Sequence, residues 1–152
     1  MSDSAIKSIL LSKCFEYVEQ RIETSRQAMR HAQEASNSEE KSSAGDKYET
    51  GRAMAQIERD KAAQQLEEAM KLKATLTQIK TDRVHSKVGL GSLVFTNANR
   101  FYLSISVGKV SVDGSDYLFI SPSSPIGQLL LNRKEKDQFT FNKELHTIGK
   151  IL

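Results

Sequence analysis

Two acidic residues, Asp46 and Glu49, stand three positions apart in the polar stretch from Ser36 to Met54. Three positions are close to one helical turn, so both carboxylates can project from the same turn if a helix begins there. Mg²⁺ is bound in proteins through one or two carboxylates together with waters and phosphate oxygens. Acids at a helix start also cap exposed N–H groups and suit the helix dipole. The residues alone therefore leave two roles open, metal ligation and capping.

Two apolar-periodic segments flank this stretch and must position it. The first begins near Ser2, Asp3 and Ser4, which offer N-cap side chains, and the second runs from about Asp46 to Thr81. Apolar and small residues recur in both at steps of three and four, which is the spacing of a coiled-coil seam. The first seam contains Leu11, Phe15, Val18, Ile22, Ser25, Met29 and Ala32, and the second contains Ala55, Ala62, Leu66, Ala69, Leu72, Leu76 and Ile79.

The apolar periodicity stops after Ala35, and Ser, Asn, Glu and Lys follow until Gly45, which indicates a turn. We therefore predict an antiparallel two-helix coiled-coil hairpin over residues 1–82, with its tip at about 36–50. About 30 residues per helix, at a rise of about 1.5 Å each, give a rod on the order of 45 Å long.

From Val84 onward the pattern changes to short β-rich runs. Asp113-Gly114 is a strong signal for a tight turn between strands. Ser124 followed by Pro125 predicts an N-cap and the first residue of a short helix. The predicted strands are Ser92–Thr96, Arg100–Val107, Lys109–Val112, Tyr117–Ser121, Gln138–Asn142 and His146–Leu152. Residues 86–152 are thus expected to form a small α+β domain with an antiparallel sheet and one short helix.

The amino-acid composition excludes several classes of protein. The single cysteine, Cys14, excludes an internal disulfide, a multi-cysteine zinc site and a CxxC redox motif, and we expect it to be buried. The histidines show no ligand spacing. A net charge of +3 is compatible with an acidic protein or a nucleic acid as partner, but is weak for a dedicated DNA-binding protein. The single cysteine makes a cytoplasmic location the expected one. No run is apolar for long enough to span a membrane or to form a signal peptide, so we expect a soluble, unprocessed protein.

The run ISPSSPIGQLLL, residues 120–131, together with the helical segments before it, resembles the bacterial Gre transcript-cleavage factors. In that family a similar run with Ser-Pro-Ile-Gly and a small apolar helix lies in a C-terminal domain with an FKBP-like fold. The Lys136-Asp137 pair stands where the family usually has Gly-Asp. The resemblance implies an FKBP-like domain here, and we expect Ser124, Pro125, Ile126 and Gly127 to contact a polymerase partner.

The stretch between the two helices gives a second match. Gre factors carry Gly-Asp-Leu-Ser-Glu-Asn there, and this chain has Gly45-Asp46-Lys47-Tyr48-Glu49-Thr50. The glycine and both acids match, whereas the three other positions differ. The loop before Gly45 is longer than in the family, which leaves Glu39 and Glu40 as rival acids.

The resemblance implies a transcription elongation factor that inserts its hairpin into the secondary channel of bacterial RNA polymerase. The polymerase's own active site would cleave the backtracked nascent RNA at its 3′ end, and Asp46 and Glu49 would help to hold a second Mg²⁺. Lys41, Lys47, Arg52 and Arg59 would steer the hairpin toward RNA phosphates, or serve only solubility. We expect a monomeric accessory factor that is not itself an enzyme, binds no cofactor stably and does not associate with a membrane.

Three alternatives remain open. A regulator of the same shape would occupy the channel without stimulating cleavage, because Lys47, Tyr48 and the longer loop change the metal geometry. A prolyl isomerase would use the FKBP-like domain, although no aromatic-lined pocket can be assembled from this half of the sequence. A coiled-coil adaptor would pair the hairpin with a helix of another protein.

Overall fold

A computed structural model describes the backbone of residues 2–40 and 45–152 and the side chains of residues 2–38 and 49–152. The protein is α+β, with two long helices followed by a six-stranded mixed sheet and a short helix. The chain forms two compact units. The sheet unit contains Met1–Phe15 and Thr75–Leu152, and the hairpin unit contains Glu16–Ala74. The sheet unit thus includes the first residues of the first long helix and the last residues of the second.

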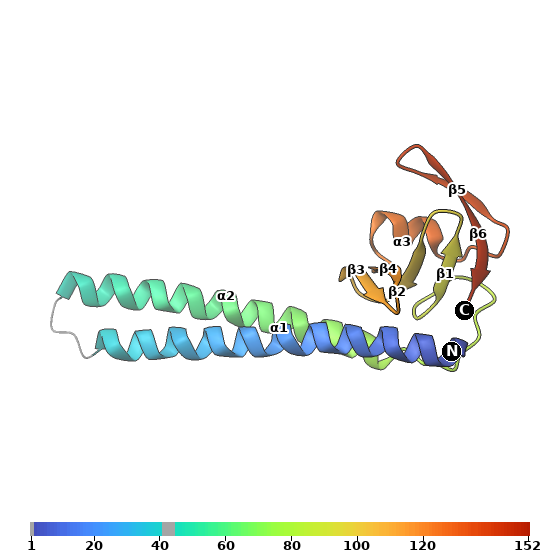
Figure 1. The fold of residues 1–152 in the computed structure, drawn as a ribbon. Helices are drawn as coiled ribbons and strands as arrows, with labels where there is room; N and C mark the ends of the chain where they lie inside the picture. The colour runs from blue at the N-terminus through green and yellow to red at the C-terminus, as the bar shows by residue number, and fades with distance from the viewer. Residues whose placement is uncertain (1, 41–44) are drawn as a thin grey trace. The chain divides into compact units, whose positions relative to one another are not determined.

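The two predicted helices are present, as α1 (Asp3–Glu40) and α2 (Gly45–Thr77), and they run in opposite directions side by side in the hairpin unit (Figure 1). Ser2 caps α1, because its Oγ accepts the Ala5 N–H at 3.1 Å. The turn predicted to begin at Ser36 is wrong for residues 36–40, since α1 continues through Glu40. The apolar pattern indicates only which residues are buried, so a helix with polar side chains can continue after the pattern stops. One such polar contact links successive turns here, because the Gln33 side-chain amide donates to Asn37 Oδ1 at 3.1 Å.

The seam of the hairpin unit is made largely of small residues. Val18 and Ile22 are buried on α1, and farther along the same helix Ser25 and Ala32 take their place. The facing residues of α2 are Ala55, Ala62 and Ala69, all buried. An ion pair joins Lys73 Nζ to Glu19 Oε1 across the helices at 2.7 Å. The predicted seam is confirmed at these positions, whereas Met29 and Leu66 are only half-buried.

The seam prediction fails near the start of α1, within the sheet unit. Leu10 and Cys14 are fully buried there, while Leu11 and Phe15 are half-buried. The reason is tertiary, because Cys14 Sγ donates to Ser104 Oγ at 3.3 Å, just beyond the end of a strand. The sheet therefore selects the buried face of this part of the helix, one residue away from the face that the periodicity favoured.

The sheet is mixed, not antiparallel as predicted. Its order is β3-β4-β2-β1-β6-β5, and β2 pairs with β4 in parallel, with Phe101 opposite Leu118. The strands are β1 (Leu93–Thr96), β2 (Arg100–Leu103), β3 (Gly108–Val112), β4 (Ser115–Ile120), β5 (Gln138–Phe141) and β6 (Glu144–Ile151). The tight turn at Asp113-Gly114 places β3 at the edge as the hairpin partner of β4. Strand β4 therefore returns between β3 and β2, parallel to β2, a crossover that strand patterns do not reveal.

The sheet is covered on both faces. Helix α3 (Pro125–Leu130) lies beside the strands in Figure 1, and its Ile126 and Leu130 share a core cluster with Phe101, Leu103 and Ile148. Along β2 side chains alternate between faces, so Tyr102 lies on the opposite face from Phe101 and Leu103. Tyr102 is fully buried, with Phe119 edge-on at 5.3 Å. No helix in the described part of the chain is long and apolar enough to cross a membrane.

Candidate functional site

The start of α3 is built as the sequence predicted. Ser124 is the N-cap, and its Oγ accepts the Gly127 N–H at 3.1 Å while donating to the Ser121 carbonyl at 2.7 Å. Pro125 occupies the first turn, where its missing N–H costs nothing. The hydroxyl thus ties the helix to the preceding loop in both directions, and this rigid corner presents Pro125 to solvent.

The next two residues of this segment, Ile126 and Gly127, are buried in the interior of the sheet unit. Ile126 is 9% exposed and packs in the core, so its side chain is not a surface for a partner. Gly127 is buried, and a Cβ at this position would overlap the carbonyl oxygen of Ser121. The four residues expected to bind a partner therefore divide into two groups. Ser124 and Pro125 reach the surface, whereas Ile126 and Gly127 hold the loop in place.

The acids near the hairpin end are only partly described. Helix α2 begins at Gly45, which puts Asp46 and Glu49 in its first turns. The side chain of Glu49 is exposed, and the side chains of Asp46 and of the rival acids Glu39 and Glu40 lie outside the described residues. The sequence prediction that a second helix starts at this point is confirmed. The predicted pairing of the two carboxylates stays a prediction.

The basic residues around these acids are likewise divided. Arg52 and Arg59 are exposed on α2. Lys41 lies outside the described residues, as does the side chain of Lys47. Among the described side chains, no group of three or more His, Cys, Asp or Glu residues gathers closely enough to hold a metal ion.

Two titratable groups that sequence reasoning missed lie in the sheet unit. Lys7 is only 2% exposed, and its Nζ donates to the Arg83 carbonyl at 3.1 Å. Burial lowers its pKa, and nearby Arg83 acts in the same direction, whereas Asp3 and Asp82 oppose the shift. A signal for Lys7 existed in the sequence, because it falls three residues before Leu10 and seven before Cys14, on the buried face of α1.

His85 is the second of these groups. It is 9% exposed, and its pKa is lowered to about 4 by burial first and then by the charges of Lys7 and Arg83. The imidazole is therefore neutral at physiological pH, in a place where the local potential is positive. No ligand spacing in the sequence pointed to this residue, since its neighbours come from α1 and from the segment after α2.

Cys14 is buried, as predicted, and burial raises the pKa of its thiol to about 11. A thiol in that state is a poor nucleophile near neutral pH. Burial and the proximity of Cys14 also raise the pKa of Tyr102. The Tyr102 hydroxyl has no hydrogen-bond partner among the described residues. These two groups form part of the core and enclose no cavity among those found in the described part of the sheet unit.

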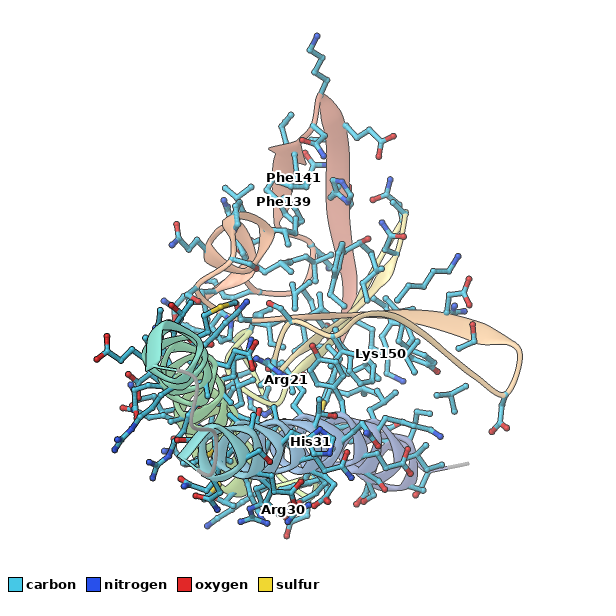
Figure 2. All side chains as sticks on the ribbon, turned by 90° about the vertical axis from the view of Figure 1, so that its left-hand side faces the viewer. Arg21, Arg30, His31, Phe139, Phe141 and Lys150 are labelled. Carbon is cyan, nitrogen blue, oxygen red and sulfur yellow. The ribbon has the colours of Figure 1, made fainter. Side chains whose placement is uncertain are left out.

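A second buried histidine, His146, is packed between aromatic rings. Its ring stacks on Phe139 at 5.0 Å with an interplanar angle of 5°, and Phe101 lies 6.3 Å away. Figure 2 shows Phe139 and Phe141 on the same strand, beside helix α3. The Nδ1 atom of His146 has no partner within the described residues. Its place inside the aromatic core favours packing over ligand binding.

A scan of protein-family models gives no match to this chain, and a comparison with curated proteins gives none either.

Proposed function

We propose that this protein is a Gre-type transcription elongation factor. It binds the secondary channel of bacterial RNA polymerase with its hairpin and stimulates cleavage of backtracked RNA by the polymerase active site. The observation that carries the proposal is the start of α2 at Gly45, with Asp46 and Glu49 in its first turns, at the end of a two-helix hairpin. The resemblance of Gly45–Thr50 and of residues 120–131 to the Gre motifs supplies the function.

The hairpin unit is suited to a probe that acts inside another protein. Its buried seam is filled from within one chain, by residues such as Ile22, Ala32 and Ala62. A seam that is already filled argues against an adaptor that pairs with a foreign helix. The remaining exposed apolar side chains of α2, Met54, Ile57 and Met70, lie outside that seam.

Asp46 and Glu49 would hold an Mg²⁺ ion jointly with groups of the polymerase. The Glu49 carboxylate is exposed, so it is accessible to an ion that lies between two proteins. A second metal stabilises the attacking and leaving oxygens in an in-line displacement at a phosphate. In this proposal the chain delivers carboxylates, and exposed Arg52 and Arg59 attract the RNA backbone toward them. The FKBP-like identity of the sheet unit and the docking role of Ser124 and Pro125 belong to the same proposal.

The test is RNA cleavage in a stalled, backtracked bacterial elongation complex with Mg²⁺. Wild-type protein should shorten the RNA from its 3′ end. The Asp46→Asn/Glu49→Gln double variant should lose at least about 100-fold in rate while still binding the polymerase, because it loses both metal ligands and keeps the hairpin. Glu58→Gln is the matched control, since Glu58 is an exposed acid farther along α2, and it should leave the rate unchanged.

A second candidate function is a regulator that binds the polymerase channel in the same way but does not stimulate RNA cleavage. Lys47, Tyr48 and Thr50 differ from the family motif next to the two acids, which favours a regulator that only occupies the channel. Polymerase binding without any shortened RNA would reject the first proposal in favour of this one. Absence of binding at equimolar concentrations in the micromolar range would reject both.

A further inference from the structure

A polar cavity of ≈ 370 Å³ lies in the sheet unit, along the segment that follows α2. Basic, hydroxyl and amide side chains line it together with backbone. The lining residues include Arg83, His85, Ser86, Lys87, Gly89 and Asn132. Within the described part of the chain, no carboxylate lines this cavity. A hollow of this size with two permanent cations and no acid is suited to a small oxyanion.

The hydrogen-bond donors of this segment are available. Among residues 2–40 and 45–152, no acceptor is found for the backbone N–H groups of Val84, His85, Ser86 and Lys87. Runs of such N–H groups make anion-binding concavities in proteins. The side chains of Arg83 and Lys87 also form no ion pair with a described residue.

His85 is a second observation that favours a ligand in this cavity. It is nine-tenths buried, it lines the cavity, and no described residue makes a hydrogen bond to its ring. The two ring nitrogens of a neutral imidazole are one donor and one acceptor, and in His85 neither is used by a described residue, so both are available to a ligand in the cavity. Water can satisfy the ring, but an anion would in addition compensate the positive potential around it.

The surrounding charges favour the same sign of ligand. The charge of buried Lys7 acts on His85 and lowers its pKa, and the only side-chain hydrogen bond of Lys7 to a described residue goes to the Arg83 carbonyl. Asp3 and Asp82 line an adjoining cavity of ≈ 200 Å³, which also contains Lys7 and shares Arg83 and Val84 with this one. Burial is the main cause of the lowered His85 pKa of about 4, and the charges of Lys7 and Arg83 lower that pKa further.

We propose that the cavity formed by Arg83, His85, Ser86, Lys87 and Asn132 binds a phosphate group. Arg83 and Lys87 supply charge, and the N–H groups of residues 84–87 with the Ser86 hydroxyl supply directed donors. Phosphate fits better than a carboxylate because its oxygens can accept from several directions at once. The site is separate from the hairpin acids and does not depend on their role.

The test is a titration of the full chain with inorganic phosphate, followed by two-dimensional ¹H–¹⁵N NMR at constant ionic strength near neutral pH. The amide signals of residues 84–87 should shift and saturate, and a matched chloride titration should leave them in place. In a second measurement, phosphate should raise the pKa of His85 from about 4, because a bound anion stabilises the imidazolium. An unchanged His85 pKa under saturating phosphate would overturn the assignment.

Substitutions test whether phosphate binds at Arg83 and Lys87. Arg83→Gln/Lys87→Gln should weaken phosphate binding at least about tenfold, because two charge-assisted contacts are lost. Both side chains are exposed, and the bond from Lys7 goes to the Arg83 backbone, so the fold should be retained. Lys143→Gln, a matched loss of an exposed lysine at the β5–β6 turn, should change nothing. Equal weakening by both variants, or saturable shifts with acetate equal to those with phosphate, would overturn the proposal.

Discussion

The two units of the chain bury different kinds of side chain. The sheet unit packs large residues on both faces of its sheet, including Tyr102, Leu103 and Phe119, each at most 1% exposed. The hairpin unit buries mainly alanine along α2, at Ala55, Ala62 and Ala69. Burial stabilises by roughly 25 cal/mol per Å² of apolar surface, so an alanine contributes far less than a leucine or an aromatic residue. The sheet unit therefore buries much apolar surface in a core of large side chains, whereas the hairpin unit buries little, along a single line of small side chains.

The units also differ in where their charges lie. In the hairpin unit the described ion pairs are at the surface, such as Arg30 with Glu23 and Lys71 with Glu67, and such pairs contribute little stability. Arg30 and His31, labelled on α1 in Figure 2, are both exposed. The sheet unit instead buries titratable groups, of which Lys7 and His85 carry lowered pKa values. Core mutations and pH should therefore act chiefly on the sheet unit.

The largest effect is expected in the sheet core. Leu103→Ala should lower the free energy of unfolding by about 2–5 kcal/mol, since Leu103 is fully buried and a cavity would remain among its neighbours. Urea unfolding followed by circular dichroism measures the loss. Leu145→Ala is the matched control, because Leu145 is 55% exposed, and it should stay within about 0.5 kcal/mol of wild type. Similar losses for the two variants would mean that the sheet core is not the dense region described.

The next largest effect is a loss of stability of the sheet unit at low pH, caused by protonation of His85. The folded-state pKa of His85 is about 4, below the ordinary value of 6.5, so the unfolded chain binds a proton first as pH falls. The contribution of neutral His85 to stability is complete above pH 6.5 and is lost as pH drops toward 4. The shift from 6.5 to about 4 spans roughly 2.5 pKa units, and each unit corresponds to about 1.4 kcal/mol, which puts the loss on the order of 3 kcal/mol.

The variant His85→Gln should flatten that part of the stability profile relative to wild type. The comparison is made by urea unfolding at a series of pH values across the same window. Carboxylates that titrate at low pH, such as Asp116, contribute equally to both proteins and cancel in the difference. Wild-type and variant curves of equal slope between pH 6.5 and 4 would show that His85 is not the group responsible.

The smallest effect concerns the thin seam. Ala62→Leu should destabilise the hairpin by about 1–3 kcal/mol, because the close approach of α1 and α2 at a buried alanine leaves no room for three more carbons. Thermal loss of helical circular dichroism measures this change. Gln64→Leu, at an exposed position two residues away, is the control and should be near neutral. A stabilising Ala62→Leu would reveal a loosely packed seam and would reverse the comparison.

Sequence patterns were most reliable where local chemistry decides the structure. Ser124 and Pro125 predicted a capped helix start, and the observed N-cap bond to Gly127 follows from those side chains alone. The Asp113-Gly114 signal predicted a tight turn, and both residues adopt positive φ there. The helix start at Gly45 was placed correctly for a similar reason. The end of α1 was not, because the apolar pattern fades before the helix does.

The sequence by itself determined two long helices, the seam from Val18 outward, the strand-rich second half and the capped helix α3. It did so because periodicity and capping act between residues that are close along the chain. Only the tertiary structure decided the parallel pairing of β2 with β4, the burial of Leu10 and Cys14 in place of Leu11 and Phe15, and the buried cluster of Lys7 with His85. Those features depend on segments far apart in sequence, such as α1 and the residues after α2, whose packing sets the buried face and the local potential.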